Sequence, residues 1–86
     1  MFRFREPVRI ASQNYDLYYI FLIYSGQRIK IDSNTANILE TLRQKQLFTK
    51  NEYLNIVSKY SYQHIEKYSN IFNEMVRLGI IYEQHG

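Results

Sequence analysis

The side chains best suited to acid–base or metal chemistry are few and scattered along the chain. There are two histidines, His64 and His85, and no cysteine. The histidines lie too far apart in the sequence to form a short-spaced ligand pair. The eight carboxylates are spread over predicted helix surfaces, and three glycines do not make a phosphate-binding loop. We therefore expect no catalytic residues, no metal site and no cofactor, and predict a binding module rather than an enzyme.

The composition is that of one small domain spanning residues 1–86, with 45% hydrophobic residues to build its core. The beginning of the chain lacks the apolar segment of a signal peptide. The longest apolar run, residues 17–24, is far shorter than the roughly 20 residues of a membrane-spanning helix. We expect a cytoplasmic protein with no membrane partner. Residues 1–31 carry five basic and two acidic residues, which accounts for the net charge of +3.

Three strand signals occupy the first third of the chain. Residues 8–11 alternate after Pro7, residues 18–24 are rich in aromatic and β-branched side chains, and residues 27–31 follow a predicted two-residue turn, Ser25-Gly26. That turn would pair Phe21 with Lys30. The predicted core face carries Tyr18, Ile20, Leu22, Ile29 and Ile31, and the opposite face carries Tyr19, Phe21, Ile23, Arg28 and Lys30.

Three helices are predicted after the strands. Asp32 is a candidate N-cap for the first, and Thr49 with Glu52 matches a capping box for the second. Ser61 is the expected cap of a third helix that ends at Leu78, before Gly79. We predict an α+β, winged helix-turn-helix-like fold, with an N-terminal three-stranded antiparallel sheet followed by three helices. One broad stripe of the third helix is apolar: Ile65, Tyr68, Ile71, Phe72, Met75, Val76 and Leu78.

One candidate function is that of a winged-helix DNA-binding transcriptional regulator. Such a protein places positive charge on its recognition helix, but the third helix balances Lys67 and Arg77 with Glu66 and Glu74. A wing would also be expected after that helix, and only seven residues follow Gly79. Nucleic acid is therefore an unlikely partner.

The other candidate function is peptide binding by strand addition. If residues 8–11 and 27–31 flank the central strand, residues 27–31 form a sheet edge to which an extended peptide can add. Arg28 and Lys30 are equally well explained as charges that prevent edge-to-edge aggregation, and such charges would still admit an acidic peptide. The residues alone leave these two explanations open.

The order of the motifs resembles the PqqD-like family, also called RiPP recognition elements. The stretch "FLIYSGQRIKIDSNTANILETL" is followed by "TKNEYLNIV" and "FNEMVRLGII". The family pattern is a hairpin, a segment like L-N-x-T-A-x-x-I-L, two further helices and an ending like L-x-x-x-G-[LI]-[IV]. The similarity covers about residues 7–83, although Asp32 or Asn34 stands where a single Asn usually follows the strand.

The resemblance implies that the chain binds the leader segment of a ribosomally synthesised precursor peptide. It would present the peptide to a separate maturation enzyme, such as a protease, a cyclase or another modifying enzyme. The leader would lie beside the third strand, in a cleft shared with the third helix. The implied peptide-binding residues are Gln27, Arg28, Ile29, Lys30, Ile31, Ile65, Tyr68, Phe72 and Val76.

Overall fold

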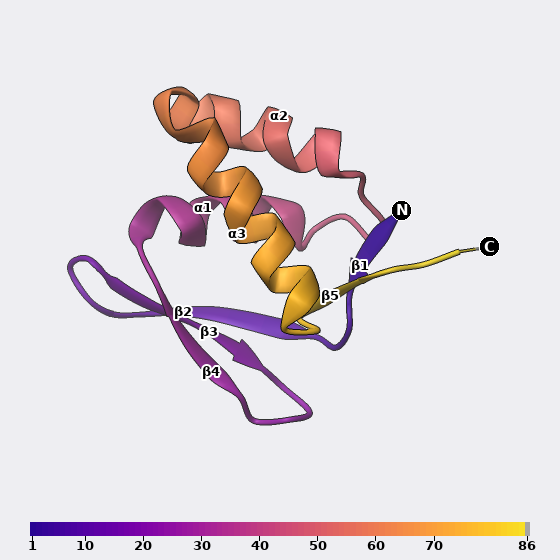
Figure 1. Cartoon of the computed structure of the whole chain (residues 1–86). Coiled ribbons are helices and arrows are strands. Elements are labelled where there is room, and N and C mark those ends of the chain that lie inside the picture. The colour runs from indigo at the N-terminus through magenta and orange to yellow at the C-terminus, as the bar shows by residue number, and fades with distance from the viewer. Residues whose placement is uncertain (86) are drawn as a thin grey trace.

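The computed structural model describes residues 1–85 and has an α+β architecture, with a three-stranded antiparallel sheet and helices (Figure 1). This confirms the predicted class at that level. In Figure 1 the helices lie above the three-stranded sheet. The elements are β1 (Phe2–Phe4), β2 (Val8–Asn14), β3 (Leu17–Leu22), β4 (Arg28–Ile31), α1 (Ser33–Leu42), α2 (Lys50–Ser61), the 3-10 turn η1 (Tyr62–His64), α3 (Ile65–Arg77) and β5 (Ile81–Glu83).

The predicted register of the β3–β4 hairpin is wrong by two residues. Phe21 pairs with Arg28 rather than Lys30, and a longer loop replaces the two-residue turn. The cause is distant in the sequence: the Glu6 carboxylate accepts hydrogen bonds from the backbone N–H groups of Tyr24 and Ser25, at 2.6 and 2.8 Å. Because side chains alternate with a period of two, the shift leaves the residues of β3 and β4 on their predicted faces, whereas Ile23 lies in the loop beyond β3.

Helix ends follow local side-chain chemistry where a cap is present. The Asp32 carboxylate caps α1 by accepting the Thr35 N–H at 2.7 Å. Both hydrogen bonds of the Thr49–Glu52 capping box open α2. The predicted Ser61 cap is wrong, because α2 continues through Ser61 and α3 begins at Ile65 without a side-chain cap. Gly79 ends α3 with a φ of 77°, a left-handed conformation that favours glycine.

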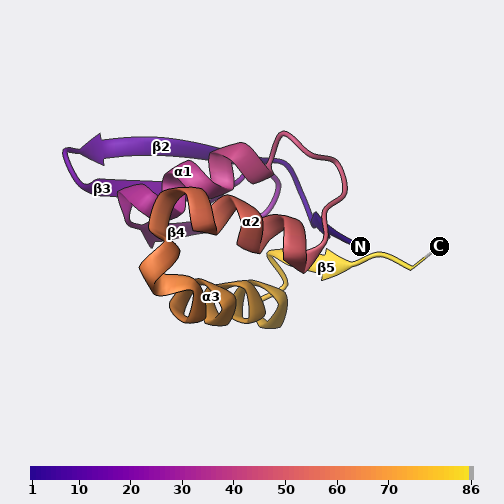
Figure 2. The same cartoon turned by 90° about the horizontal axis from the view of Figure 1, so that it is seen from above.

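β1 and β5 form a second, two-stranded sheet that was not predicted and that packs against the core. β1 pairs antiparallel with β5, and the two strands lie side by side in Figure 2. Phe2 and Phe48 also exchange backbone hydrogen bonds, at 2.7 and 3.0 Å. This arrangement brings the Phe2 ring against Phe72, with ring centroids 4.9 Å apart, so both ends of the described chain contribute to one core.

Candidate functional site

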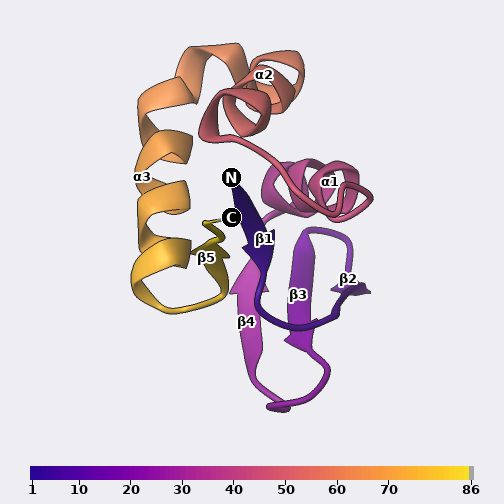
Figure 3. The ribbon, with the colours of Figure 1, turned by 90° about the vertical axis from the view of Figure 1, so that its right-hand side faces the viewer.

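The three-stranded sheet has an unpaired edge at β4. The strand order is β2-β3-β4, and within residues 1–85 no strand other than β3 pairs with β4. Figure 3 shows β4 as the strand of this sheet that lies toward α3, with β2 at the far edge. The predicted edge at residues 27–31 is therefore present, with the strand itself spanning Arg28–Ile31.

The hydrogen bonds around β3 show which main-chain groups of β4 are free. Leu22 N–H donates to the Gln27 carbonyl oxygen at 2.9 Å, while Ile23 N–H donates to the Pro7 oxygen on the other side at 3.0 Å. Main-chain directions alternate along an antiparallel strand. Given the β3–β4 register, Ile29 and Ile31 direct their N–H and C=O groups toward β3. The corresponding groups of Arg28 and Lys30 point to the open edge.

A cavity of about 290 Å³ lies next to this edge, between β4, the start of α1 and the C-terminal half of α3. Its volume is close to the lower limit of about 300 Å³ for ligand pockets, which suits side-chain anchors better than a whole small molecule. Eight of its lining residues are apolar, so a group that enters it leaves water for a mostly apolar surface. The lining residues are Ile20, Ile29, Lys30, Ile31, Asp32, Thr35, Leu39, Ile71, Glu74, Met75, Leu78 and Ile80.

The charges around the cavity are divided by sign. The side chains of Arg28 and Lys30 are exposed on the outer face of the sheet, and the Arg28 guanidinium carbon lies 4.9 Å from the Tyr19 ring centroid. Asp32 and Glu74 stand at the cavity itself. Desolvation alone would raise the pKa of Asp32, but hydrogen bonds from Thr35 and the charge of Lys67, 3.8 Å away, lower it overall. Asp32 therefore stays ionised at neutral pH.

Three of the five predicted strand residues line the cavity, but none of the predicted residues of α3 does. Ile29, Lys30 and Ile31 line the cavity, whereas Gln27 and Arg28 do not. None of the four predicted α3 residues lines it: Ile65, Tyr68, Phe72 and Val76. Tyr68 and Phe72 are buried in the core, Ile65 packs against the core, and Val76 is 38% exposed.

The residues of α3 and its C-cap that do line the cavity are Ile71, Glu74, Met75 and Leu78. Ile71, Met75 and Leu78 are spaced by four and three residues, so they form one side of a helix. They belong to the same apolar stripe as the predicted set but are rotated toward the sheet. Leu78 is 47% exposed and forms an accessible lip of the cavity. The stripe was visible in the sequence, but its orientation was not.

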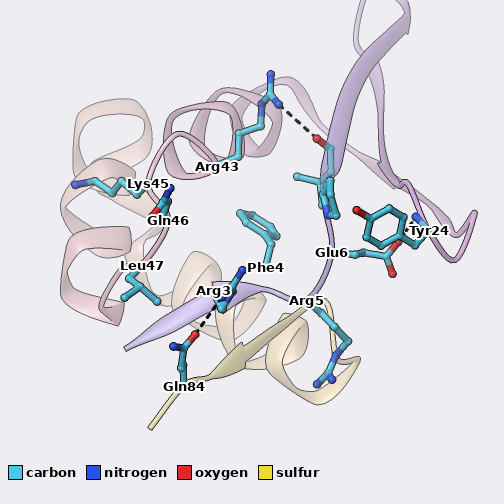
Figure 4. A pocket seen from close by; sticks show the side chains of 12 residues that line it. Arg3, Phe4, Arg5, Glu6, Tyr24, Arg43, Lys45, Gln46, Leu47 and Gln84 are labelled. Carbon is cyan, nitrogen blue, oxygen red and sulfur yellow. Dashed lines mark hydrogen bonds between the residues drawn. The ribbon is translucent and has the colours of Figure 1, made fainter. Parts of the chain in front are cut away.

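A second, larger cavity of about 760 Å³ was not predicted from the sequence (Figure 4). Phe4 points toward its middle, and Lys45 points away from it. Its four basic side chains already have partners: Arg3 donates to Gln84 Oε1, Arg5 to the Gly79 oxygen, Arg43 pairs with Glu40, and Lys45 pairs with Glu52. We therefore do not take this cavity as the main candidate site.

Glu6, which lines the second cavity, is expected to make the hairpin loop pH-sensitive. The backbone hydrogen bond from Ser25, helped by that from Tyr24, holds the pKa of Glu6 below its usual 4.5. Because the pKa of Glu6 is lowered, its ionised carboxylate holds the loop at neutral pH. Protonation of Glu6 weakens these hydrogen bonds as the pH falls through that pKa. In an NMR titration from about pH 6 to 2.5, the Tyr24 and Ser25 amide signals should move with a midpoint below 4.5. The same movement in a Glu6→Gln variant would contradict this assignment.

The two histidines do not take part in a cluster of possible metal ligands in the described chain. Within residues 1–85 no three His, Cys, Asp or Glu side chains come together as a metal-binding group. His64 is exposed at the start of α3, and His85 Nε2 lies 3.7 Å from Glu83. In the same part of the chain, no helix has the length and apolar character needed to cross a membrane.

Comparisons with known proteins identify no relative of this chain. No family model, no curated protein and no solved structure matches this chain. The features of the molecule that indicate a binding site are the open edge of β4 and the apolar cavity beside it.

Proposed function

We propose that this chain is a non-catalytic module that binds an extended peptide as an additional strand along β4. The observation that carries the proposal is the coincidence of an open strand edge with an apolar cavity directly beside it. An added strand would receive main-chain hydrogen bonds from Arg28 and Lys30. Every second side chain of the peptide would face the cavity, as in other complexes formed by strand addition.

The energies of these contacts predict weak to moderate affinity for a peptide. The N–H and C=O groups of Arg28 and Lys30 offer up to four hydrogen bonds, each worth about 1 kcal/mol net. One or two apolar anchors in the cavity would contribute roughly 1.5–3 kcal/mol apiece. Ordering a flexible peptide opposes binding. These gains total at most about 10 kcal/mol before the costs are subtracted, so we expect a dissociation constant weaker than about 1 μM, which corresponds to about −8.2 kcal/mol.

The peptide we propose is the leader segment of a ribosomally synthesised precursor, and the setting is the cytoplasm. The module would present the rest of the precursor to a separate maturation enzyme. We interpret the helices and sheet as a winged helix-turn-helix-like arrangement used for peptide rather than DNA binding. This interpretation is based on the motif similarity over residues 7–83 and on the charge balance of α3. Lys67 lies 3.8 Å from Asp32, and Arg77 pairs with Glu74, so α3 offers little positive charge to a DNA backbone.

An amide NMR titration with the leader of a small precursor encoded beside this gene tests the proposal. Saturable shifts should concentrate in residues 28–31, the open strand edge, and in residues 71–78, the segment that contributes Ile71, Glu74, Met75 and Leu78 to the cavity. Residues 50–61 of α2 line neither side of the cavity and serve as the internal reference. Absence of shifts with the leader, together with salt-dependent binding to duplex DNA, would instead favour a transcriptional regulator.

A further inference from the structure

We infer that the peptide accepted by β4 alternates apolar and acidic side chains, with the acidic ones on the outer face of the sheet. The inference rests on the proposed function and specifies the chemistry of its ligand. It follows from the different surroundings of the two faces at the β4 edge. In either orientation of an added strand, successive side chains point to opposite faces of the sheet.

The inner positions of the added strand meet an apolar surface. Ile29 and Ile31 point to this side of β4, and Ile71, Met75 and Leu78 face them from α3. Lys30, Asp32 and Glu74 also line the cavity, but the two acidic residues are already paired with Lys67 and Arg77. An acidic side chain directed inward would lose its hydration at a mostly apolar surface, which is unfavourable. The inner positions therefore select apolar side chains and reject acidic ones.

The outer positions of the added strand lie beside the basic side chains of Arg28 and Lys30. On this face Arg9 pairs across from Phe21, which pairs with Arg28, and Ala11 pairs across from Tyr19, which pairs with Lys30. None of these six residues is acidic. Within residues 1–85, neither Arg28 nor Lys30 forms a salt bridge with a carboxylate. An outward-facing Glu or Asp on the added strand would lie beside Arg28 and Lys30, the favourable cross-strand arrangement.

The same charges argue against a second copy of this chain as the occupant. Antiparallel pairing of two β4 edges would place Arg28 and Lys30 of one copy beside the same residues of the other, all on one face of the joined sheet. Like charges in adjacent strands are destabilising. The arrangement of charges thus blocks self-pairing while it favours an acidic partner strand, so both roles considered for these basic residues are compatible.

Three synthetic nine-residue peptides test the inference. All carry Leu at alternate positions, and the positions between them are all Glu, all Gln or all Lys. Fluorescence anisotropy should show the Glu peptide binding the wild-type protein about five- to tenfold more tightly than the Lys peptide. Raising the salt concentration should narrow that difference. In the double variant Arg28→Glu/Lys30→Glu the order of the Glu and Lys peptides should reverse.

A matched double variant, Arg3→Glu/Lys59→Glu, changes the net charge equally but leaves the outer face of the three-stranded sheet intact. It should retain the wild-type order of affinities, since Arg3 lies on β1 of the other sheet and Lys59 on α2. Equal binding of the Glu and Lys peptides by the wild-type protein would overturn the inference while leaving strand addition in place. Failure of all three peptides, including the neutral Gln peptide, would overturn the inference and count against strand addition as well.

Discussion

Replacing Phe72 with alanine is expected to destabilise the fold by about 3–5 kcal/mol, the usual cost of removing a buried aromatic ring. Phe72 is 1% exposed, and its ring centroid lies 4.9 Å from those of Phe2 and Tyr53 and 6.5 Å from that of Phe48. Small domains have about 5–15 kcal/mol of total stability, so much of it would be lost. Chemical denaturation followed by circular dichroism measures the change.

Val76→Ala is the matched control on the same helix. Val76 is 38% exposed and does not belong to the core cluster, so the change should stay within about 0.5 kcal/mol. A Phe72→Ala variant as stable as Val76→Ala would mean that the aromatic cluster does not hold α3 against β1 and α2. The comparison also matters for binding experiments: lost peptide binding in Phe72→Ala could reflect unfolding rather than a missing contact.

The parts of the fold predicted correctly depend on short-range chemistry. The Asp32 cap and the Thr49–Glu52 capping box join residues three apart, so a local pattern is sufficient to recognise them. The faces of β3 and β4 were also predictable, because alternation is intrinsic to a strand. The edge position of β4 followed from the order of the strands along the chain.

The errors arose where a distant residue decides the local conformation. Ser25-Gly26 resembles a two-residue turn, but Glu6 holds Tyr24 and Ser25 in a longer loop. Without the structure, nothing in the hairpin sequence indicates that a carboxylate 18 residues earlier accepts those two N–H groups. The two-residue shift in register changed the cross-strand neighbours of β3 and β4 but not the faces of their side chains. The prediction that β4 is an edge strand was therefore unaffected.

The orientation of α3 was unpredictable for a related reason. Its broad apolar stripe can face either the sheet or the other helices. The rings of Phe2, Phe48 and Tyr53 surround Phe72, which turns Ile71 and Leu78 toward β4. The position of Phe2 depends in turn on β1 pairing with β5 at the opposite end of the chain. The alternation of Phe2 and Phe4 with Arg3 and Arg5 was a usable strand signal, but its pairing partner was not identifiable.

Lys30→Pro is expected to weaken peptide binding by at least about tenfold while leaving the domain folded. The N–H of Lys30 points to the open edge, so its loss removes a donor to the peptide but none from the β3–β4 ladder. Proline is tolerated on edge strands where the N–H faces solvent. The proline ring also obstructs close approach of an added strand. Leader affinity can be measured by calorimetry, with circular dichroism to verify folding.

Two further variants distinguish the loss of the Lys30 N–H from the loss of its charge and from unfolding of the domain. Lys30→Ala removes the same charge but keeps the N–H, so it should retain more affinity than Lys30→Pro. Ile29→Pro removes an N–H directed toward β3 and a side chain that packs on the core, so it should destabilise the domain itself. Equal leader affinity for Lys30→Pro and Lys30→Ala, in folded proteins, would show that the main chain of β4 takes no part in binding. A clearly lower leader affinity for Lys30→Pro than for Lys30→Ala would indicate that the peptide backbone lies along the outward N–H and C=O groups of Arg28 and Lys30. Both variants lose the lysine side chain, but only Lys30→Pro also loses the backbone N–H.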